Sequence, residues 1–184
     1  MPLALDTDLI ERARGDGAAL DALVVAVWPE AYRIAVSILR DPGLAEDSAQ
    51  EACAAIVRAL PGLKNVAGFA AWSYRIVVNA AITAARRRPR VQSLETVGDA
   101  ATTFDTSEAM DLHAALARLS VVQRAVVVLH YYAGLDSREI AAAISAPSST
   151  VRFHLMLARR ALRKALSPID PSTMPSDEVL PHVR

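Results

Sequence analysis

The stretch Leu135–Leu166, LDSREIAAAISAPSSTVRFHLMLARRALRKAL, predicts two helices joined by a short turn. Asp136 can cap the first helix, and Glu139, three residues later, can bond back to the cap, which is the pattern of a sharply started helix. Pro147 cannot continue the hydrogen-bond ladder, and Ser148 offers a cap for a second helix that starts directly after it. This outline is typical of a helix-turn-helix.

The second predicted helix has two different faces. Apolar residues recur at helical spacing and form a stripe that can pack on a neighbouring helix, namely Val151, Leu155, Ala158, Leu162 and Leu166. The other side carries Ser149, Arg152, Phe153, Met156, Arg160 and Arg163 and can be presented to DNA. Basic helices with one apolar stripe also occur in bundles that never touch DNA, so the motif alone leaves both interpretations open.

The length of the chain allows one ordinary domain or two small helical ones, and its composition fits an all-α protein. Of the 184 residues, 53% are hydrophobic and only 5% aromatic, which is compatible with alanine-rich helical packing. The formal net charge is zero, but net charge hides how charges are distributed. Arginines cluster at 86–90, whereas residues 91–117 carry Asp and Glu without any Lys or Arg. We therefore expect two basic modules flanking an acidic connection.

The predicted helices follow from caps and breakers. In the first half of the chain we expect helices at Thr7–Arg40, with Pro29 starting a new helix at Glu30, at Pro42–Leu60, and at Phe69–Arg88 after a loop at Lys64–Gly68. In the second half we expect a helix at Glu108–Leu119, a helix capped by Ser120 and ended by Gly134, and the final pair of helices described above. The predicted domains are residues 1–90 and 108–166, joined by a flexible linker at 91–107 and followed by a proline-broken, mobile tail at 167–184.

Several function classes are excluded. Cys53 is the single cysteine and the histidines are scattered, so we predict no disulfide, metal or cofactor. The run His130-Tyr131-Tyr132 lies in an apolar helix without a nucleophile or base, and we expect no enzymatic activity. No segment is expected to have the length or flanks of a membrane span or signal peptide, which predicts a cytoplasmic protein without membrane insertion.

The first module contains two candidate binding faces. Asp47, Gln50 and Glu51 share one side of a helix by their spacing, and no nucleophile or phosphate loop accompanies them, so a polar binding face is favoured over an active site. Arg75 and Asn79 are four residues apart and are candidates for nucleic-acid contact. Trp72, on the same helix, is assigned to packing.

Three segments carry a resemblance to a known family: LRDPGLAEDSAQEA at 39–52, GFAAWSYRIVVNAAITAARRR at 68–88, and the stretch from Leu119 to Leu166. In this order and spacing, they resemble the small bacterial sigma factors of the extracytoplasmic-function group. The resemblance runs from about Asp16 to Leu166. It implies two helical domains, of which the first binds core RNA polymerase and opens the promoter at the minus-ten element, and the second reads the minus-thirty-five element. It also implies stabilisation of melted DNA and promoter-specific initiation of transcription.

The resemblance assigns roles residue by residue. It implies that Asp47, Gln50 and Glu51 bind the beta-prime clamp helices of polymerase. It places the loop Pro61–Gly68, with Lys64 and Asn65, where a flipped base of the minus-ten element is captured, and Arg75, Asn79, Arg86 and Arg87 on the promoter-facing helix. For the minus-thirty-five element it implies Ser149, Thr150, Arg152, Phe153, His154, Met156, Arg159, Arg160 and Arg163. The beta flap of polymerase, promoter DNA and an anti-sigma factor are the implied partners, and the protein would join the nucleoid when bound to polymerase.

The sequence departs from the family pattern at several positions. Cys53 and Val57 stand where a large aromatic is usual, and Thr83 replaces an aspartate. Ser145 stands where a turn glycine is common, which costs strain if that residue needs a positive φ. Phe153, His154 and Leu157 stand where serine or arginine is frequent. We therefore predict that Arg152 is the main base-reading arginine and that Phe153 or Met156 touches a thymine methyl group.

Two alternatives of other classes accompany this hypothesis. An ordinary helix-turn-helix regulator would use the first module for dimerisation or ligand binding and would bind duplex DNA without polymerase. A non-DNA adaptor would sequester a regulator through its helical faces. Association with core RNA polymerase separates the three.

Overall fold

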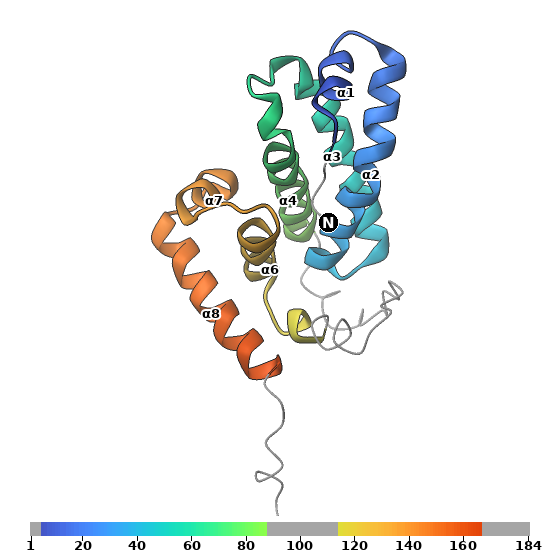
Figure 1. Ribbon diagram of the computed structural model, residues 1–184. Helices are drawn as coiled ribbons and strands as arrows, with labels where there is room; N and C mark the ends of the chain where they lie inside the picture. The colour runs from blue at the N-terminus through green and yellow to red at the C-terminus, as the bar shows by residue number, and fades with distance from the viewer. Residues whose placement is uncertain (1–4, 88–113, 167–184) are drawn as a thin grey trace, which may run out of the picture.

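The computed structural model describes residues 5–87 and 114–166, and every regular element in these two segments is helical (Figure 1). The first segment, 5–87, contains α1 (Thr7–Arg12), α2 (Gly17–Leu39), α3 (Pro42–Ala59), the short turns η1 (Leu60–Gly62) and η2 (Val66–Gly68), and α4 (Phe69–Arg87). The second segment, 114–166, contains α6 (Val121–Val127), the wide turn η4 (Val128–Tyr132), α7 (Ser137–Ile144) and α8 (Ser148–Leu166). The predicted linker and tail lie outside the described residues.

The helices begin where capping residues stand. Asp41 accepts a 3.0 Å hydrogen bond from the Leu44 amide and starts α3. Ser120 and Asp136 each form a reciprocal capping box, with Gln123 and Glu139 respectively. These residues satisfy amides that have no partner inside the helix. The predicted starts of α3, α6 and α7 are confirmed.

The prediction that Pro29 opens a separate helix is wrong, because α2 runs through it without interruption. Proline lacks the amide that would bond to the carbonyl four residues earlier, at Val25. Pro29 is exposed and the Val25 side chain is 73% exposed, so this interruption of the ladder lies on the solvent side of α2. The break in the predicted helix 7–40 occurs earlier, where Asp16 caps α2 and accepts a 2.9 Å hydrogen bond from Ala18.

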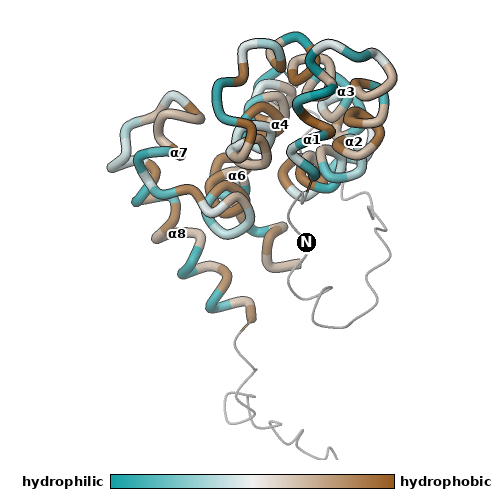
Figure 2. Tube along the Cα trace, turned by 45° about the horizontal axis from the view of Figure 1, so that its top comes forward, coloured by the Kyte–Doolittle hydropathy of each residue, from teal (hydrophilic) through white to brown (hydrophobic). Residues whose placement is uncertain are grey.

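One apolar cluster runs through both segments. In the first segment it contains Leu23 and Ile38 of α2, Ile56 of α3, and Phe69 and Val77 of α4. In the second it contains Val126, Leu129, Ile140 and Val151. Hydrophobic stretches gather in α2, α4 and α6, whereas hydrophilic stretches recur along α8 (Figure 2). The second segment therefore packs directly on the first.

Two packing predictions can be compared with this core. Trp72 is half-buried against the cluster, with its ring centroid 5.6 Å from that of Phe69, which confirms its assignment to packing. Cys53 is buried in the position expected for a large aromatic, and burial raises the pKa of its thiol.

Helix α2 is long and apolar enough to cross a membrane, by length and composition alone. The expectation that no segment of the chain reaches this length is therefore wrong. Its residues Leu23, Val27 and Ile34 are buried, and α2 packs against both α3 and α4. This packing is that of a core helix.

The second segment lies beside α4 in the folded chain. Helix α6 contacts α2 and α4, and α7 contacts α4 (Figure 1). Helix α8 packs on α6 and α7. This arrangement brings the end of α7 to the middle of α4.

Candidate nucleic-acid interface

The outward face of α8 carries most of the residues predicted to meet DNA. Val151, Leu155 and Ala158 are buried, as the apolar stripe requires. On the opposite side, Phe153 is 53% and Met156 54% exposed, and the other exposed members of the predicted set are Ser149, Arg152, Arg159, Arg160 and Arg163. Thr150 and His154 are half-buried. Leu166, predicted to lie on the packed stripe, is 45% exposed because α8 extends beyond its neighbours.

Ser145 sets the direction in which α8 leaves the turn. It adopts a left-handed conformation with φ 53° and ψ 49°, so the position does need a positive φ, and a residue with a Cβ is strained there. Directly after it, the Ala146 amide bonds to the Ala141 carbonyl at 3.0 Å and closes the end of α7. A non-glycine residue thus occupies the sharp turn between the two helices of the motif.

Two residues of η4 form side-chain hydrogen bonds with Arg159. Its Nε donates to the Tyr131 hydroxyl at 2.7 Å, and its Nη2 donates to His130 Nε2 at 3.0 Å. Because Nε2 accepts, the ring proton is on Nδ1, which donates to the Leu135 carbonyl at 2.9 Å. The π-helical turn η4 directs His130 and Tyr131 toward α8. Such turns are frequent at functional sites. The sequence analysis gave these residues no binding role and missed their contact with Arg159.

The predicted promoter-facing residues of α4 all lie at the surface. Arg75, Asn79, Arg86 and Arg87 are exposed, and the last two stand in the final turn, where cations are favourable at the negative end of the helix dipole. Asn79 also donates a 2.7 Å hydrogen bond from Nδ2 to the carbonyl of Ala143 in α7. The Asn79 side chain is therefore hydrogen-bonded to the second segment.

The predicted base-capture loop is fixed by a residue that sequence reasoning did not single out. Arg14, between α1 and α2, donates through Nη2 to the Leu63 carbonyl and forms a 3.2 Å ion pair with Glu11. Lys64 and Asn65 follow directly and are exposed. A main-chain acceptor far away in sequence leaves no signal in the pattern of residues, so nothing in the sequence could have indicated this contact.

A cavity of about 580 Å³ lies beside this loop. Lys64, Asn65, Trp72 and Arg75 line it from the first segment. The second segment lines the rest of it with Leu135, Glu139 and Ala142. Of the predicted minus-ten residues, Lys64, Asn65 and Arg75 thus meet at this cavity together with a carboxylate from α7, whereas Asn79 and Arg87 line the groove between α3 and α4 and Arg86 lines neither.

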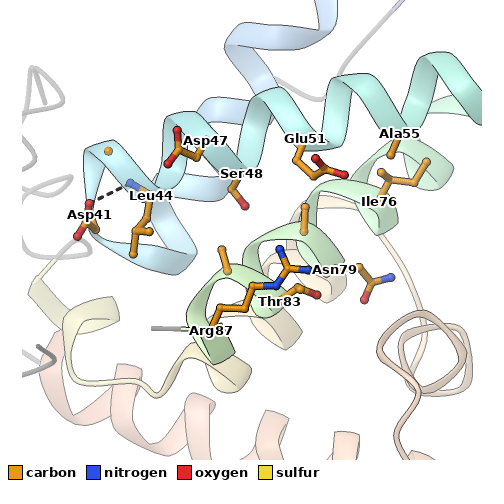
Figure 3. Close-up of a pocket in the computed structure, with 13 residues that line it drawn as sticks. Asp41, Leu44, Asp47, Ser48, Glu51, Ala55, Ile76, Asn79, Thr83 and Arg87 are labelled. Atoms are coloured by element: carbon orange, nitrogen blue, oxygen red, sulfur yellow. Dashed lines mark hydrogen bonds between the residues drawn. The ribbon is translucent and has the colours of Figure 1, made fainter. Parts of the chain in front are cut away.

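A larger groove, of about 1210 Å³, runs between α3 and α4, which pack on each other (Figure 3). Asp47 and Glu51 line it from α3, and Thr83 and Arg87 line it from α4. Gln50 is exposed on α3 but is not part of this lining. The buried Ser48, also on the α3 side, has no hydrogen-bond partner for its Oγ in the described part of the chain. Two carboxylates of α3 and the guanidinium of Arg87, at the end of α4, therefore line the same groove.

The described residues hold no group of three or more side chains suited to a metal ion. The polar groups that line the two cavities are carboxylates on α3 and α7, cations on α4 and in the loop, and the Asn65 and Asn79 amides, while the exposed cations of α8 form a separate surface. This chemistry suits binding to a charged macromolecule.

Two family models match the chain in the order of its segments. The model for sigma-70 region 2 matches residues 23–91, and the model for sigma-70 region 4 matches residues 109–162. The RNA polymerase sigma-H factor of Pseudomonas aeruginosa is 30% identical over 89% of this chain and 95% of its own length. The ECF RNA polymerase sigma-E factor of Escherichia coli is also 30% identical over the same shares of the two chains.

A solved structure supports the same fold. The sigma factor RpoE of Bartonella quintana, crystallised with the anti-sigma factor NepR, is 22% identical and superposes with a TM-score of 0.64 over 82% of this chain and 98% of that one. Sequence and structure agree on both helical segments. The chain belongs to the sigma-70 family of RNA polymerase sigma factors, within the extracytoplasmic-function group.

Proposed function

We propose that this sigma factor binds core RNA polymerase through the carboxylates of α3, captures the melted minus-ten element with the 61–68 loop and α4, and reads the minus-thirty-five element with α8. The outward face of α8 carries this proposal. There, exposed arginines alternate with Phe153 and Met156 on the second helix of a capped helix-turn-helix, which suits phosphate contact, guanine recognition and contact with thymine methyl groups.

The polymerase-binding role of α3 is supported by charge and exposure. Asp47 and Glu51 lie on the rim of the α3–α4 groove with their carboxylates accessible, and Gln50 stands on the exposed side of the same helix. Glu51 also pairs with Arg58 at 3.3 Å, and both side chains are more than half exposed, so this ion pair is easily exchanged for a basic partner. We assign this face to the clamp helices of the beta-prime subunit.

The minus-ten role is supported by the cavity beside the loop. A base must leave the stack before its pairing edge can be read, and the cost of unstacking has to be met by a pocket. Trp72 offers an aromatic edge to that cavity, and Lys64 and Arg75 offer cations for the phosphates of the strand. Arg86 and Arg87 continue the basic surface at the end of α4.

A reconstituted transcription assay tests the proposal. Core polymerase is incubated with the full chain, the bound fraction is measured, and transcripts started by the complex are mapped by sequencing. We expect stoichiometric binding and transcripts that share one pair of upstream elements. Duplex binding without polymerase association would instead favour a helix-turn-helix regulator, and the absence of both would favour an adaptor.

A pair of variants tests the α3 assignment. Asp47→Ala combined with Glu51→Ala is expected to weaken association with core polymerase at least about tenfold, because an interfacial charge pair is lost. Glu46→Ala is the matched control, since Glu46 is exposed on the same helix but does not line the groove. Equal binding of the two variants would remove α3 from the interface.

Two further assignments complete the proposal. The RpoE structure contains an anti-sigma factor, and we propose a partner of that kind for this chain, which co-purification from its native host would detect. We also propose that the chain acts in the cytoplasm, at the nucleoid when bound to polymerase, and has no catalytic activity of its own. Its effect would be to position polymerase and to stabilise melted DNA.

A further inference from the structure

Arg159 of α8 is held along one edge by side chains of its own segment. Its Nε donates to the Tyr131 hydroxyl at 2.7 Å, and its Nη2 donates to His130 Nε2 at 3.0 Å. The guanidinium carbon lies 5.6 Å from the centroid of the Tyr131 ring. Nε and Nη2 form one edge of the planar guanidinium, so both contacts use the same edge. Because the group is rigid, fixing this edge also fixes the direction in which Nη1 points.

The other edge of the guanidinium is available to an anion. Nη1 and the second hydrogen of Nη2 donate to none of the residues that the structure describes. Arg159 forms no ion pair with the carboxylates of these residues, and its side chain is exposed. Two parallel N–H donors match the two oxygens of a phosphate. Arg159 thus keeps an unneutralised charge and a bidentate donor pair for a ligand.

His130 is itself fixed in the form that can accept. Its Nδ1 donates to the Leu135 carbonyl at 2.9 Å, which leaves the lone pair of Nε2 for Arg159. The rings of His130 and Tyr131 meet edge to face, with their centroids 4.8 Å apart. Adjacent residues of an α-helix do not face the same neighbour, whereas the π-helical turn η4 directs both rings to one guanidinium. The support of Arg159 is therefore ordered by contacts of its own.

The place of Arg159 along α8 favours contact with the DNA backbone. It follows Arg152 by about two helical turns, which is roughly 10 Å along the axis, so both side chains leave the same face. In a helix-turn-helix the N-terminal residues of the second helix reach the base edges. A cation two turns later is displaced from that position toward the edge of the groove, where the phosphates lie.

We infer that His130 and Tyr131 are positioning residues, which hold Arg159 ready for a bidentate contact with a backbone phosphate of the minus-thirty-five element. This inference rests on the proposed minus-thirty-five role of α8. An arginine that is already ordered loses less side-chain freedom on binding, so the support strengthens the contact. Because a phosphate carries no sequence information, the gain applies to every duplex alike.

A double-mutant cycle tests the link between Tyr131 and Arg159. Affinity is measured for the polymerase-loaded protein on a fluorescent duplex that carries the upstream element found by transcript mapping. Arg159→Ala is expected to weaken binding about tenfold and to reduce the logarithmic dependence of affinity on salt concentration by about 1. Tyr131→Phe, which keeps the ring, should weaken binding about fivefold. In the double variant Tyr131→Phe should cause no further loss, because both side chains act through one contact.

Two controls separate this coupling from a general loss of stability. Arg160 is the next residue and is also exposed, but η4 holds the guanidinium of Arg159. In an Arg160→Ala background, Tyr131→Phe should therefore still weaken binding about fivefold. Tyr132→Phe removes a hydroxyl that donates to Glu30, and should leave duplex affinity unchanged. Additive losses from Tyr131→Phe and Arg159→Ala, or equal losses from the two tyrosine variants, would overturn the inference.

The acceptor on His130 gives a second test. His130→Leu removes the acceptor and should weaken duplex binding about fivefold, whereas His130→Gln keeps an acceptor oxygen and should stay within about twofold of the unaltered protein. Matched and mismatched duplexes should lose affinity equally in His130→Leu. Equal losses in the two variants would remove His130 from the positioning role. A loss confined to one base pair would overturn the assignment of Arg159 to a phosphate.

Side-chain dynamics test the positioning without DNA. In NMR relaxation of the arginine Nε–H groups of the full chain, the Arg159 group should be more ordered than the Arg160 group. Tyr131→Phe should abolish this difference, because it removes the acceptor of the Arg159 Nε–H. Equal order of the two arginines in the unaltered chain would contradict the positioning.

These outcomes are separable from failure of the proposed function. If the polymerase-loaded chain binds the duplex and Arg152→Ala relaxes its selectivity, but Tyr131→Phe leaves affinity unchanged, the positioning role is refuted and the function stands. If the unaltered polymerase-loaded chain fails to bind the duplex, the proposed role of α8 is wrong, and the assignment of Arg159 to a promoter phosphate fails with it.

Discussion

Asn79 and Ala143 lie 64 residues apart in sequence, yet the Asn79 side-chain amide donates a 2.7 Å hydrogen bond to the Ala143 carbonyl. The acceptor belongs to the last turn of α7, which ends just before Ser145, the left-handed residue that sets the direction of α8. The donor belongs to the helix proposed to face the minus-ten element. One hydrogen bond therefore joins the two proposed promoter-reading surfaces.

Arg14→Ala is expected to loosen the base-capture loop. The variant removes a charged donor from the Leu63 carbonyl, a type of hydrogen bond worth about 1.5 to 3 kcal/mol. We expect a loss of about 2 kcal/mol in the free energy of unfolding and a shorter lifetime of the open promoter complex, measured by denaturant titration and competitor challenge. Arg12→Ala is the control, because its ion pair with Asp8 is exposed and is worth less than about 1 kcal/mol. Equal losses in the two variants would contradict the role of Arg14.

Asp136 predicts a specific dependence of stability on pH. Hydrogen bonds from the Glu139 and Arg138 amides lower the pKa of its carboxyl below the value of about 3.9 in an unfolded chain. A lowered folded-state pKa means that the stabilisation is present above the unfolded pKa and is lost as pH falls through the folded one. Asp136→Asn keeps a capping side chain but does not titrate. The unaltered chain should therefore lose more stability than this variant between pH 7 and about pH 3, as thermal unfolding at the two pH values would show. An identical loss would contradict the prediction.

Ser145→Gly is expected to stabilise the second segment. Ser145 holds φ at 53°, which costs a residue with a Cβ about 1 kcal/mol, and glycine adopts this conformation freely. We expect a gain of roughly 0.5 to 1 kcal/mol in the free energy of unfolding by denaturant titration. Ala142→Gly, three residues earlier and exposed within regular helix, should lose about 1 kcal/mol and serves as the opposite control. A loss at both positions would show that the turn gains nothing from glycine.

Arg152→Ala should relax promoter selectivity. A bidentate contact between arginine and guanine is worth about 1 to 3 kcal/mol, so discrimination at one position of the minus-thirty-five element should fall about tenfold. The measurement compares matched and mismatched duplexes bound by the polymerase-loaded protein. Arg160→Ala, also exposed on α8, is expected to weaken binding to all duplexes alike, as loss of a phosphate contact does. Unchanged selectivity in Arg152→Ala would assign base reading to another residue.

Local signals in the sequence were sufficient to predict much of the fold. The caps at Asp41, Ser120 and Asp136 act over three or four residues, so a short window contains both partners. The left-handed conformation of Ser145 meets the condition that comparison with the family pattern raised, because glycine is common at that turn position. Pro29 misled the prediction because its cost depends on which side of the helix faces solvent, and that is decided by packing.

The contacts between distant parts of the chain could not be predicted. Arg14 and Arg124 both donate to main-chain carbonyls, 49 and 86 residues away in sequence, and any residue type supplies such an acceptor. Tyr132 finds Glu30 across 102 residues for a similar reason, since each was interpretable as part of its own helix. The family pattern assigns surfaces to polymerase and promoter, but it contains no information on how the segments pack on each other.

The apolar cluster that runs through both segments has a thermodynamic consequence. Side chains such as Ile38 and Leu129 come from different segments but belong to the same cluster, so neither segment can melt without exposing hydrocarbon of the other. Differential scanning calorimetry should therefore record a single endotherm whose calorimetric and van't Hoff enthalpies agree. Two resolved endotherms would mean that the segments unfold as independent units.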